Sequence, residues 1–237
     1  MSALESRVLA RTVRRRLRVR YLLSRPTGKA PADAWPLLIY LHGAGAKGNR
    51  IDLVAREPLL QLAATGHAAK WLIACPQCPA ERSGFCVEDL DRWLDDLLAT
   101  LPADPRCVCL TGQSMGGRGA YEWAYERASR FAALLPVCAF GLPALAPRLR
   151  GLPVWSFHGA RDEVVPVARA EEMHAALRAA GVAARFNRLA RGAHAIGRQV
   201  YARKEVWKWL SLKTTAGGST AGLPGRAARA LGLRARA

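Results

Sequence analysis

The stretch Cys107-Val108-Cys109-Leu110-Thr111-Gly112-Gln113-Ser114-Met115-Gly116-Gly117 combines two structural signals in a short distance. Its apolar start is typical of a strand that is buried on both faces, and a helical pattern begins near residue 120. Between them stands a G-x-S-x-G motif, whose small residues let neighbouring backbone pass close to a strained serine turn. The stretch therefore predicts a nucleophile elbow, with Ser114 as the nucleophile at the start of a helix.

Similar apolar runs recur along the chain and are expected to form strands, at residues 37–41, 71–75, 107–110, 132–137, 154–157 and 185–189. Helical patterns lie between them and after them, at residues 87–101, 120–130, 167–180 and 200–212. Residues 8–23 alternate arginine with apolar side chains and predict an opening antiparallel strand or hairpin. This alternation predicts an α/β fold with a mostly parallel central sheet and helices on both faces.

Two downstream residues are expected to join Ser114 in a catalytic triad. Asp162 follows the strand at 154–157, and His194 follows the last strand, so the chain order is Ser, Asp, His, as in nucleophile-elbow hydrolases. A serine hydroxyl is a weak nucleophile, which an imidazole can activate by accepting its proton, while a carboxylate orients the imidazole. Glu163, one residue further along, is the alternative acid.

The chain has five histidines, and four of them are not expected to be catalytic. They precede or lie within predicted turns, loops and helices, where a histidine more often packs or caps: His42, His67, His158 and His174.

A glycine-rich loop follows the strand at 37–41. Its glycines at 43, 45 and 48 match the G-x-G-x-x-G pattern of dinucleotide sites, but residues 48–56 provide no second strand that ends in an acidic residue. We instead expect an oxyanion hole formed by the backbone N–H groups of Ala44 and Met115, with Gly45 as the next candidate for the first donor. This interpretation requires no cofactor.

The six cysteines lie mostly in apolar runs and are expected to be free, buried thiols. Cys75 and Cys78 have the C-x-x-C spacing of a redox or zinc motif, but no second pair completes a four-ligand site. The sequence therefore predicts no metal centre.

The formal net charge of +18 favours anionic partners in principle. The arginines are spread along the chain and do not alternate with the aromatic residues that stack on single-stranded bases, so we do not expect nucleic-acid binding. A catalytically silent basic module that binds nucleic acid or anionic surfaces is the alternative from another functional class.

Residues 1–212 are expected to form one hydrolase domain, and the basic residues 213–237, rich in Gly, Ala, Ser and Arg, a disordered tail. The twelve residues 141–152 are too few for a multi-helix lid, so no large cap domain is expected.

Neither a signal-like apolar run at the N-terminus nor an apolar stretch long enough to span a membrane is present, which predicts a cytoplasmic protein. The oligomeric state stays open.

Four motifs together resemble one branch of the α/β-hydrolases: residues 41–48, Cys75-Pro76-Gln77-Cys78-Pro79, residues 110–117 and His158-Gly159-x-x-Asp162-x-x-Val165-Pro166. This is the phospholipase/carboxylesterase or "predicted peptidase" branch, which is similar to dienelactone hydrolases. The resemblance covers residues 35–212 and implies the α/β-hydrolase fold, a Ser-His-Asp triad and a small-molecule ester substrate. A peptidase or thioesterase with the same triad is the alternative within this branch.

Two positions depart from the pattern of this branch. Ala193 stands where the branch usually has glycine before the histidine, and Cys75 where alanine is expected. Because alanine has less backbone freedom than glycine, the first departure bears on how the loop orients His194.

Overall fold

The structure is a computed structural model, and it describes residues 16–32 and 34–213. The predicted disordered tail, apart from Lys213, and the first part of the predicted opening strand lie outside the described residues. The predicted boundary between domain and tail therefore stays a prediction.

A seven-stranded sheet with the order β1-β3-β2-β4-β5-β6-β7 forms the centre of the molecule. β1 runs antiparallel to β3, and every other neighbouring pair is parallel. The strands are β1 (Tyr21–Ser24), β2 (Trp35–Leu41), β3 (Leu72–Pro76), β4 (Ala103–Gln113), β5 (Ala133–Val137), β6 (Val154–Gly159) and β7 (Ala184–Leu189). The predicted strands and the mostly parallel sheet are confirmed, and the opening strand is short and antiparallel.

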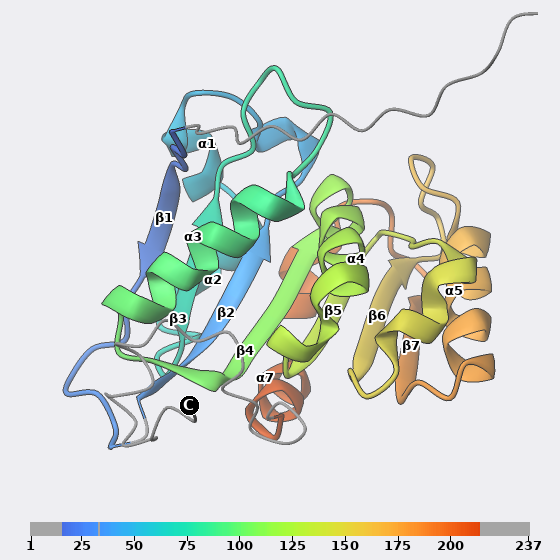
Figure 1. Cartoon of the computed structure of the whole chain (residues 1–237). Helices are drawn as coiled ribbons and strands as arrows, with labels where there is room; N and C mark the ends of the chain where they lie inside the picture. The colour runs from blue at the N-terminus through green and yellow to red at the C-terminus, as the bar shows by residue number, and fades with distance from the viewer. Residues whose placement is uncertain (1–15, 33, 214–237) are drawn as a thin grey trace, which may run out of the picture.

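Helices cover both faces of this sheet, as Figure 1 shows. One face carries α3 (Val87–Thr100), α4 (Met115–Arg127) and α5 (Val167–Ala179), and the other carries α1 (Ile51–Ala55), α2 (Pro58–Ala64), α6 (Gly197–Tyr201) and α7 (Lys204–Ser211). In β2, Leu37, Ile39 and Leu41 pack on the first face, while Leu38 and Tyr40 pack on the second. This alternation explains why the strand is apolar throughout.

Two predicted helices have different bounds in the structure. The helix expected at 200–212 is divided into α6 and α7, with a break at Ala202 and Arg203. α4 begins at Met115, directly after Ser114, although residues 116–119 are rich in glycine. Packing requires one of these glycines, because a Cβ on Gly116 would overlap the backbone carbonyl of Leu41.

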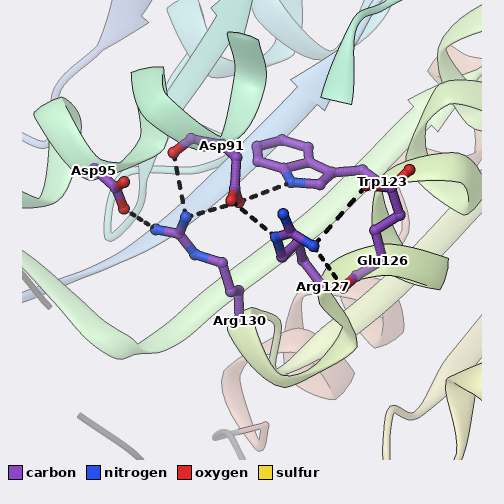
Figure 2. A network of polar contacts seen from close by, with 6 residues as sticks. All are labelled: Asp91, Asp95, Trp123, Glu126, Arg127 and Arg130. Atoms are coloured by element: carbon purple, nitrogen blue, oxygen red, sulfur yellow. Dashed lines mark hydrogen bonds and ion pairs between the residues drawn. The ribbon is translucent and has the colours of Figure 1, made fainter. Parts of the chain in front are cut away.

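A polar network, which we call the α3–α4 clamp, joins these two helices and the turn that follows α4 (Figure 2). The carboxylate of Asp91 accepts hydrogen bonds from Trp123 Nε1 (3.3 Å), Arg127 Nε (2.9 Å) and Arg130 Nη1 (2.7 Å). Arg130 also donates from Nη2 to Asp95 Oδ1 at 2.5 Å. The clamp holds the C-terminal half of α4 and the turn after it against α3.

The connection between β5 and β6 contains one 3-10 helix, Pro143–Leu149, and no multi-helix cap. Among the described residues, no helix has the length and apolar character needed to cross a membrane.

Candidate active site

Ser114 occupies a sharp turn between β4 and α4. Its backbone has φ 56° and ψ −119°, in the positive-φ region that side chains other than glycine rarely adopt. Its N–H donates to Val137 O at 2.9 Å, which ties the turn to β5. A Cβ on Gly112 would collide with the backbone of Gly116, so the motif needs small residues on both sides of the serine. The strained turn exposes Ser114 at the carboxyl ends of the parallel strands.

The three residues predicted to form the triad lie in one hydrogen-bonded line. His194 Nε2 is 2.8 Å from Ser114 Oγ, and His194 Nδ1 is 2.8 Å from Asp162 Oδ2 and 3.0 Å from Oδ1. When Nδ1 carries the hydrogen and donates it to Asp162, Nε2 is left to accept the hydroxyl proton of Ser114. The arrangement therefore has the geometry that proton transfer from the serine requires.

Asp162 is enclosed by hydrogen-bond donors. Its side chain is completely buried, and Oδ1 accepts from the N–H groups of Val164 (3.0 Å) and Val165 (2.8 Å). Burial raises the pKa of this carboxyl, but the hydrogen bonds from Val165, His194 and Val164 outweigh it, and the pKa lies below its usual value. Asp162 is therefore ionised near neutral pH. Glu163, the alternative acid, is exposed to solvent.

His158, which was expected to pack or cap, lies against Asp162. Its Nε2 is 2.9 Å from Val165 O and 3.2 Å from Asp162 Oδ2, and its side chain is buried. Because a carbonyl can only accept, Nε2 carries a hydrogen, which it donates to Val165 O beside the carboxylate of Asp162. In the sequence, this contact is indicated only by the position of His158, four residues before Asp162.

Cys138, His158 and Asp162 bring possible metal ligands within 4.8 Å of one another. Burial raises the pKa of the Cys138 thiol to about 12, so the thiol stays protonated. The oxygens of Asp162 are already occupied by the hydrogen bonds described above. This cluster therefore suits a hydrogen-bond network better than a metal centre.

No disulfide links the six cysteines. Cys75, Cys78, Cys109 and Cys138 are buried, whereas Cys86 and Cys107 are half-buried, so the expectation of buried thiols is correct for four of them.

The loop expected to carry the first oxyanion donor is held by a buried histidine. His42 Nε2 accepts the N–H of Cys78 at 2.9 Å, and His42 Nδ1 lies 2.6 Å from Gly43 O, to which it donates. Burial lowers the pKa of His42, which favours this neutral form. His42 thus caps the loop, as expected.

The two backbone groups expected to bind an oxyanion both open helical turns. Gly43 is extended, and Ala44 begins the short 3-10 helix Ala44–Ala46, while Met115 begins α4. The first N–H groups of a helical turn have no acceptor within it, so they are available for a ligand oxygen. β3, the strand after this loop, ends at Pro76 without an acidic residue, which disfavours the dinucleotide alternative.

Ala193 fits the loop that holds His194. Its φ is not among the positive values of the described residues, so the missing glycine causes no backbone strain there. Gly159 and Gly192 provide the close approach instead, because a Cβ on Gly159 would overlap the carbonyls of Gly192 and Ala193.

Comparison with known protein families places the chain among the hydrolases. The model of the dienelactone hydrolase family matches residues 80–207, more than half of the chain. The chain belongs to the dienelactone hydrolase family. Membership, together with the fold, makes it a hydrolase of the serine type with an α/β-hydrolase fold. No curated protein matches its sequence.

Solved structures with the same fold include an esterase, a thioesterase and a peptidase. A thermostable esterase is 25% identical, with a TM-score of 0.70 over 83% of this chain and 59% of the esterase. The acyl-protein thioesterase 2 of Zea mays is 21% identical, with a TM-score of 0.57 over 81% of this chain and 98% of the thioesterase. The acylaminoacyl peptidase of Pyrococcus horikoshii is 16% identical, with a TM-score of 0.63 over 83% of this chain and 40% of the peptidase. This chain therefore spans less than two thirds of the length of the esterase and of the peptidase.

Proposed function

We propose that this family member hydrolyses carboxylic esters with Ser114 as nucleophile, His194 as general base and acid, and Asp162 as the orienting acid. The observation that carries the proposal is the unbroken hydrogen-bonded line from Ser114 Oγ through His194 to Asp162. An ionised, buried Asp162 supports it, because this carboxylate fixes the imidazole tautomer and stabilises the imidazolium that forms.

The reaction proceeds in two halves. Ser114 Oγ attacks the ester carbonyl carbon while its proton moves to His194 Nε2, and the N–H groups of Ala44 and Met115 hold the oxyanion. Collapse of the tetrahedral intermediate breaks the bond to the alcohol, which leaves with the proton from His194, and an acyl-enzyme remains. Water then attacks the acyl carbon, His194 accepts the proton of the water, and the acid leaves as Ser114 regains its hydrogen.

The substrates proposed are soluble esters with short acyl groups, because the connection between β5 and β6 holds a single 3-10 helix and no lid. The loops after β5 and β6 leave Leu142 and Val164 with 55% and 67% of their surface exposed. Val164, whose N–H donates to Asp162 Oδ1, presents an exposed apolar side chain that suits a short acyl or alcohol group, and an open site needs no interfacial activation.

The first test is labelling with a fluorophosphonate probe, which reacts with an activated serine. Labelling that disappears in Ser114→Ala supports the proposal, whereas an unlabelled protein favours the silent basic module.

The second test compares p-nitrophenyl esters of increasing acyl length with thioester and peptide panels. We expect the highest kcat/KM with short esters; a higher value for a thioester or peptide would assign the site to those substrates. A jump in activity as a long-chain ester passes its micellar concentration would contradict the open site.

A further inference from the structure

Gln77 directly follows β3, and its side chain is buried. Its backbone N–H donates to Arg20 O at 2.7 Å, which ties the residue to the chain just before β1. Its side-chain Nε2 donates to Ala46 O at 2.9 Å and to Arg50 O at 2.8 Å. Both hydrogens of the amide nitrogen therefore have an acceptor. The side chain joins the end of β3 to residues 42–50, the loop that carries Ala44.

The next residue, Cys78, makes two more contacts with this loop through its backbone. Its N–H donates to His42 Nε2 at 2.9 Å, and its carbonyl accepts the N–H of Gly48 at 2.9 Å. Gly48 has φ 132°, in the region that favours glycine, so the loop can turn at this contact. Residues 77 and 78 therefore hold the loop at its start, in its middle and at its end.

The peptide group between Gly43 and Ala44 is held through its carbonyl oxygen. Gly43 O accepts from His42 Nδ1 at 2.6 Å and from Ala46 N–H at 3.2 Å. The N–H of Ala44 lies in the same planar group and points in the opposite direction, so its direction follows from the position of the carbonyl. Each of the two donors is in turn held by one of residues 77 and 78.

We propose that Gln77 is a positioning residue, which orients the Ala44 N–H toward the oxyanion by holding the carbonyl of Ala46. This inference rests on the proposed ester hydrolysis. Ala46 closes the 3-10 helix that Ala44 opens, so a shift of Ala46 would release Gly43 O and let the peptide group at Ala44 rotate. Gln77 acts through the backbone and does not contact the substrate. Its effect belongs to the transition state, because the negative charge on the carbonyl oxygen develops only there.

The test uses Gln77→Met, because methionine has nearly the length of glutamine and no hydrogen-bond donor. Gln61→Met is the matched control, since Gln61 is an exposed glutamine on α2. For each variant, kcat and KM are measured with a short p-nitrophenyl ester. Binding of a trifluoromethyl ketone, whose adduct with Ser114 carries an oxyanion, is measured in parallel. Urea unfolding shows whether each variant is folded under the assay conditions.

We expect Gln77→Met to lower kcat about 10- to 100-fold, at most the loss of a whole oxyanion donor, with KM changed less than about threefold. The affinity for the ketone should fall by a similar factor, because its adduct needs the same N–H. A residue that only stabilised the fold would change the urea midpoint and leave kcat and ketone affinity of the folded protein unchanged. Gln61→Met should match the wild type in all of these measurements.

A folded Gln77→Met variant with wild-type kcat and wild-type ketone affinity would overturn the inference. So would a loss that appears in KM instead of kcat. If Gln77→Met does not fold, Gln77→Asn decides, because its shorter side chain keeps the amide but cannot reach both carbonyls at once. Gln77→Asn should then lower kcat and ketone affinity together, and unchanged values would refute the inference. A wild type without esterase activity or probe labelling would instead contradict the proposed function itself.

Discussion

Two aspartates in this molecule each lie at the centre of several donors, yet their surroundings differ. Asp91, in the α3–α4 clamp, accepts from the indole of Trp123 and from the guanidinium groups of Arg127 and Arg130 (Figure 2). Asp162 accepts from two backbone N–H groups and from the imidazole of His194. A guanidinium keeps its proton at any ordinary pH, whereas an imidazole gains and loses one near neutrality. The clamp can therefore only hold helices together, while the line through Asp162 can take part in proton transfer.

The two carboxyl groups also differ in their exposure to solvent. The side chain of Asp91 is 19% exposed, and that of Asp162 is fully buried. For both, burial raises the pKa of the carboxyl and hydrogen bonds lower it by more, so both pKa values lie below the usual range. A charge acts more strongly where water is excluded. The buried charge of Asp162 can therefore stabilise a protonated His194. Asp91 is partly exposed and has no histidine among its partners.

The largest expected effect comes from removing the groups that exchange the proton. Ser114→Ala and His194→Ala should each lower kcat by about 10⁴ or more, and the double variant should add little, because the residues act as a unit. Steady-state kinetics with a short p-nitrophenyl ester measures this. If Ser114→Ala kept a tenth of the activity, the assignment of the nucleophile would be wrong.

Asp162→Asn tests the acid directly, with Glu163→Gln as its neighbouring control. The amide leaves the shape of the site intact but removes the charge and disturbs the histidine tautomer, so kcat should fall on the order of 10⁴. Glu163→Gln should have the activity of the wild type, because Glu163 is exposed. The reverse ranking would transfer the role of the acid to Glu163. Circular dichroism of both variants separates a loss of chemistry from a loss of fold.

Gln113 offers an intermediate effect, since it connects the serine turn with the histidine loop. Its Nε2 donates to His194 O at 3.1 Å. Gln113→Leu should lower kcat about fivefold, because one lost hydrogen bond of about 1 kcal/mol leaves His194 less well oriented. KM should stay near the wild-type value. A rise in KM by the same factor, with kcat unchanged, would mean that Gln113 acts on substrate binding.

The smallest effect is expected in the clamp, where Asp91→Asn should leave kcat unchanged and lower the free energy of unfolding by about 1 kcal/mol. The pKa of Asp91 is lower in the folded chain than in the unfolded chain. Its charge therefore stabilises the fold at every pH above the pKa that this carboxyl has in the unfolded chain. The difference between wild type and variant should therefore exist at neutral pH and disappear as the pH falls through the folded pKa. Urea unfolding at several pH values measures it.

Asp96→Asn, on the exposed side of the same helix, is the control for this clamp variant. A catalytic defect in Asp91→Asn would mean that the clamp also orients Ser114, and that the two aspartates are less different than proposed.

Sequence reasoning found the features that depend on short stretches of chain. The strands were found because both faces of each are covered, so they are apolar throughout, and the turn at Ser114 because its motif must contain small residues. The start of α4 was misplaced because glycine lowers helical propensity, while the packing against Leu41 requires glycine.

Contacts between distant residues could not be predicted in this way. The clamp joins Asp91 to arginines 36 and 39 residues further along the chain. Glu57 reaches the hydroxyl of Tyr40 only because the chain folds back onto β2 before α2, which no pattern in residues 40–57 indicates. Both contacts depend on how the elements pack, and many pairings of charged residues would have been equally consistent with the sequence.

The order of the strands has a consequence for the way the protein matures. From β4 onward, each new strand joins the edge of the sheet in chain order, and β7 is added beside β6 as the last of the described strands. Synthesis proceeds from the N-terminus, so the growing chain can extend its sheet by one strand at a time as each strand is made. His194 follows β7, so the serine turn and Asp162 are made before His194, the proposed base. A nascent chain in this order would stay without hydrolytic activity until its final sheet edge had docked.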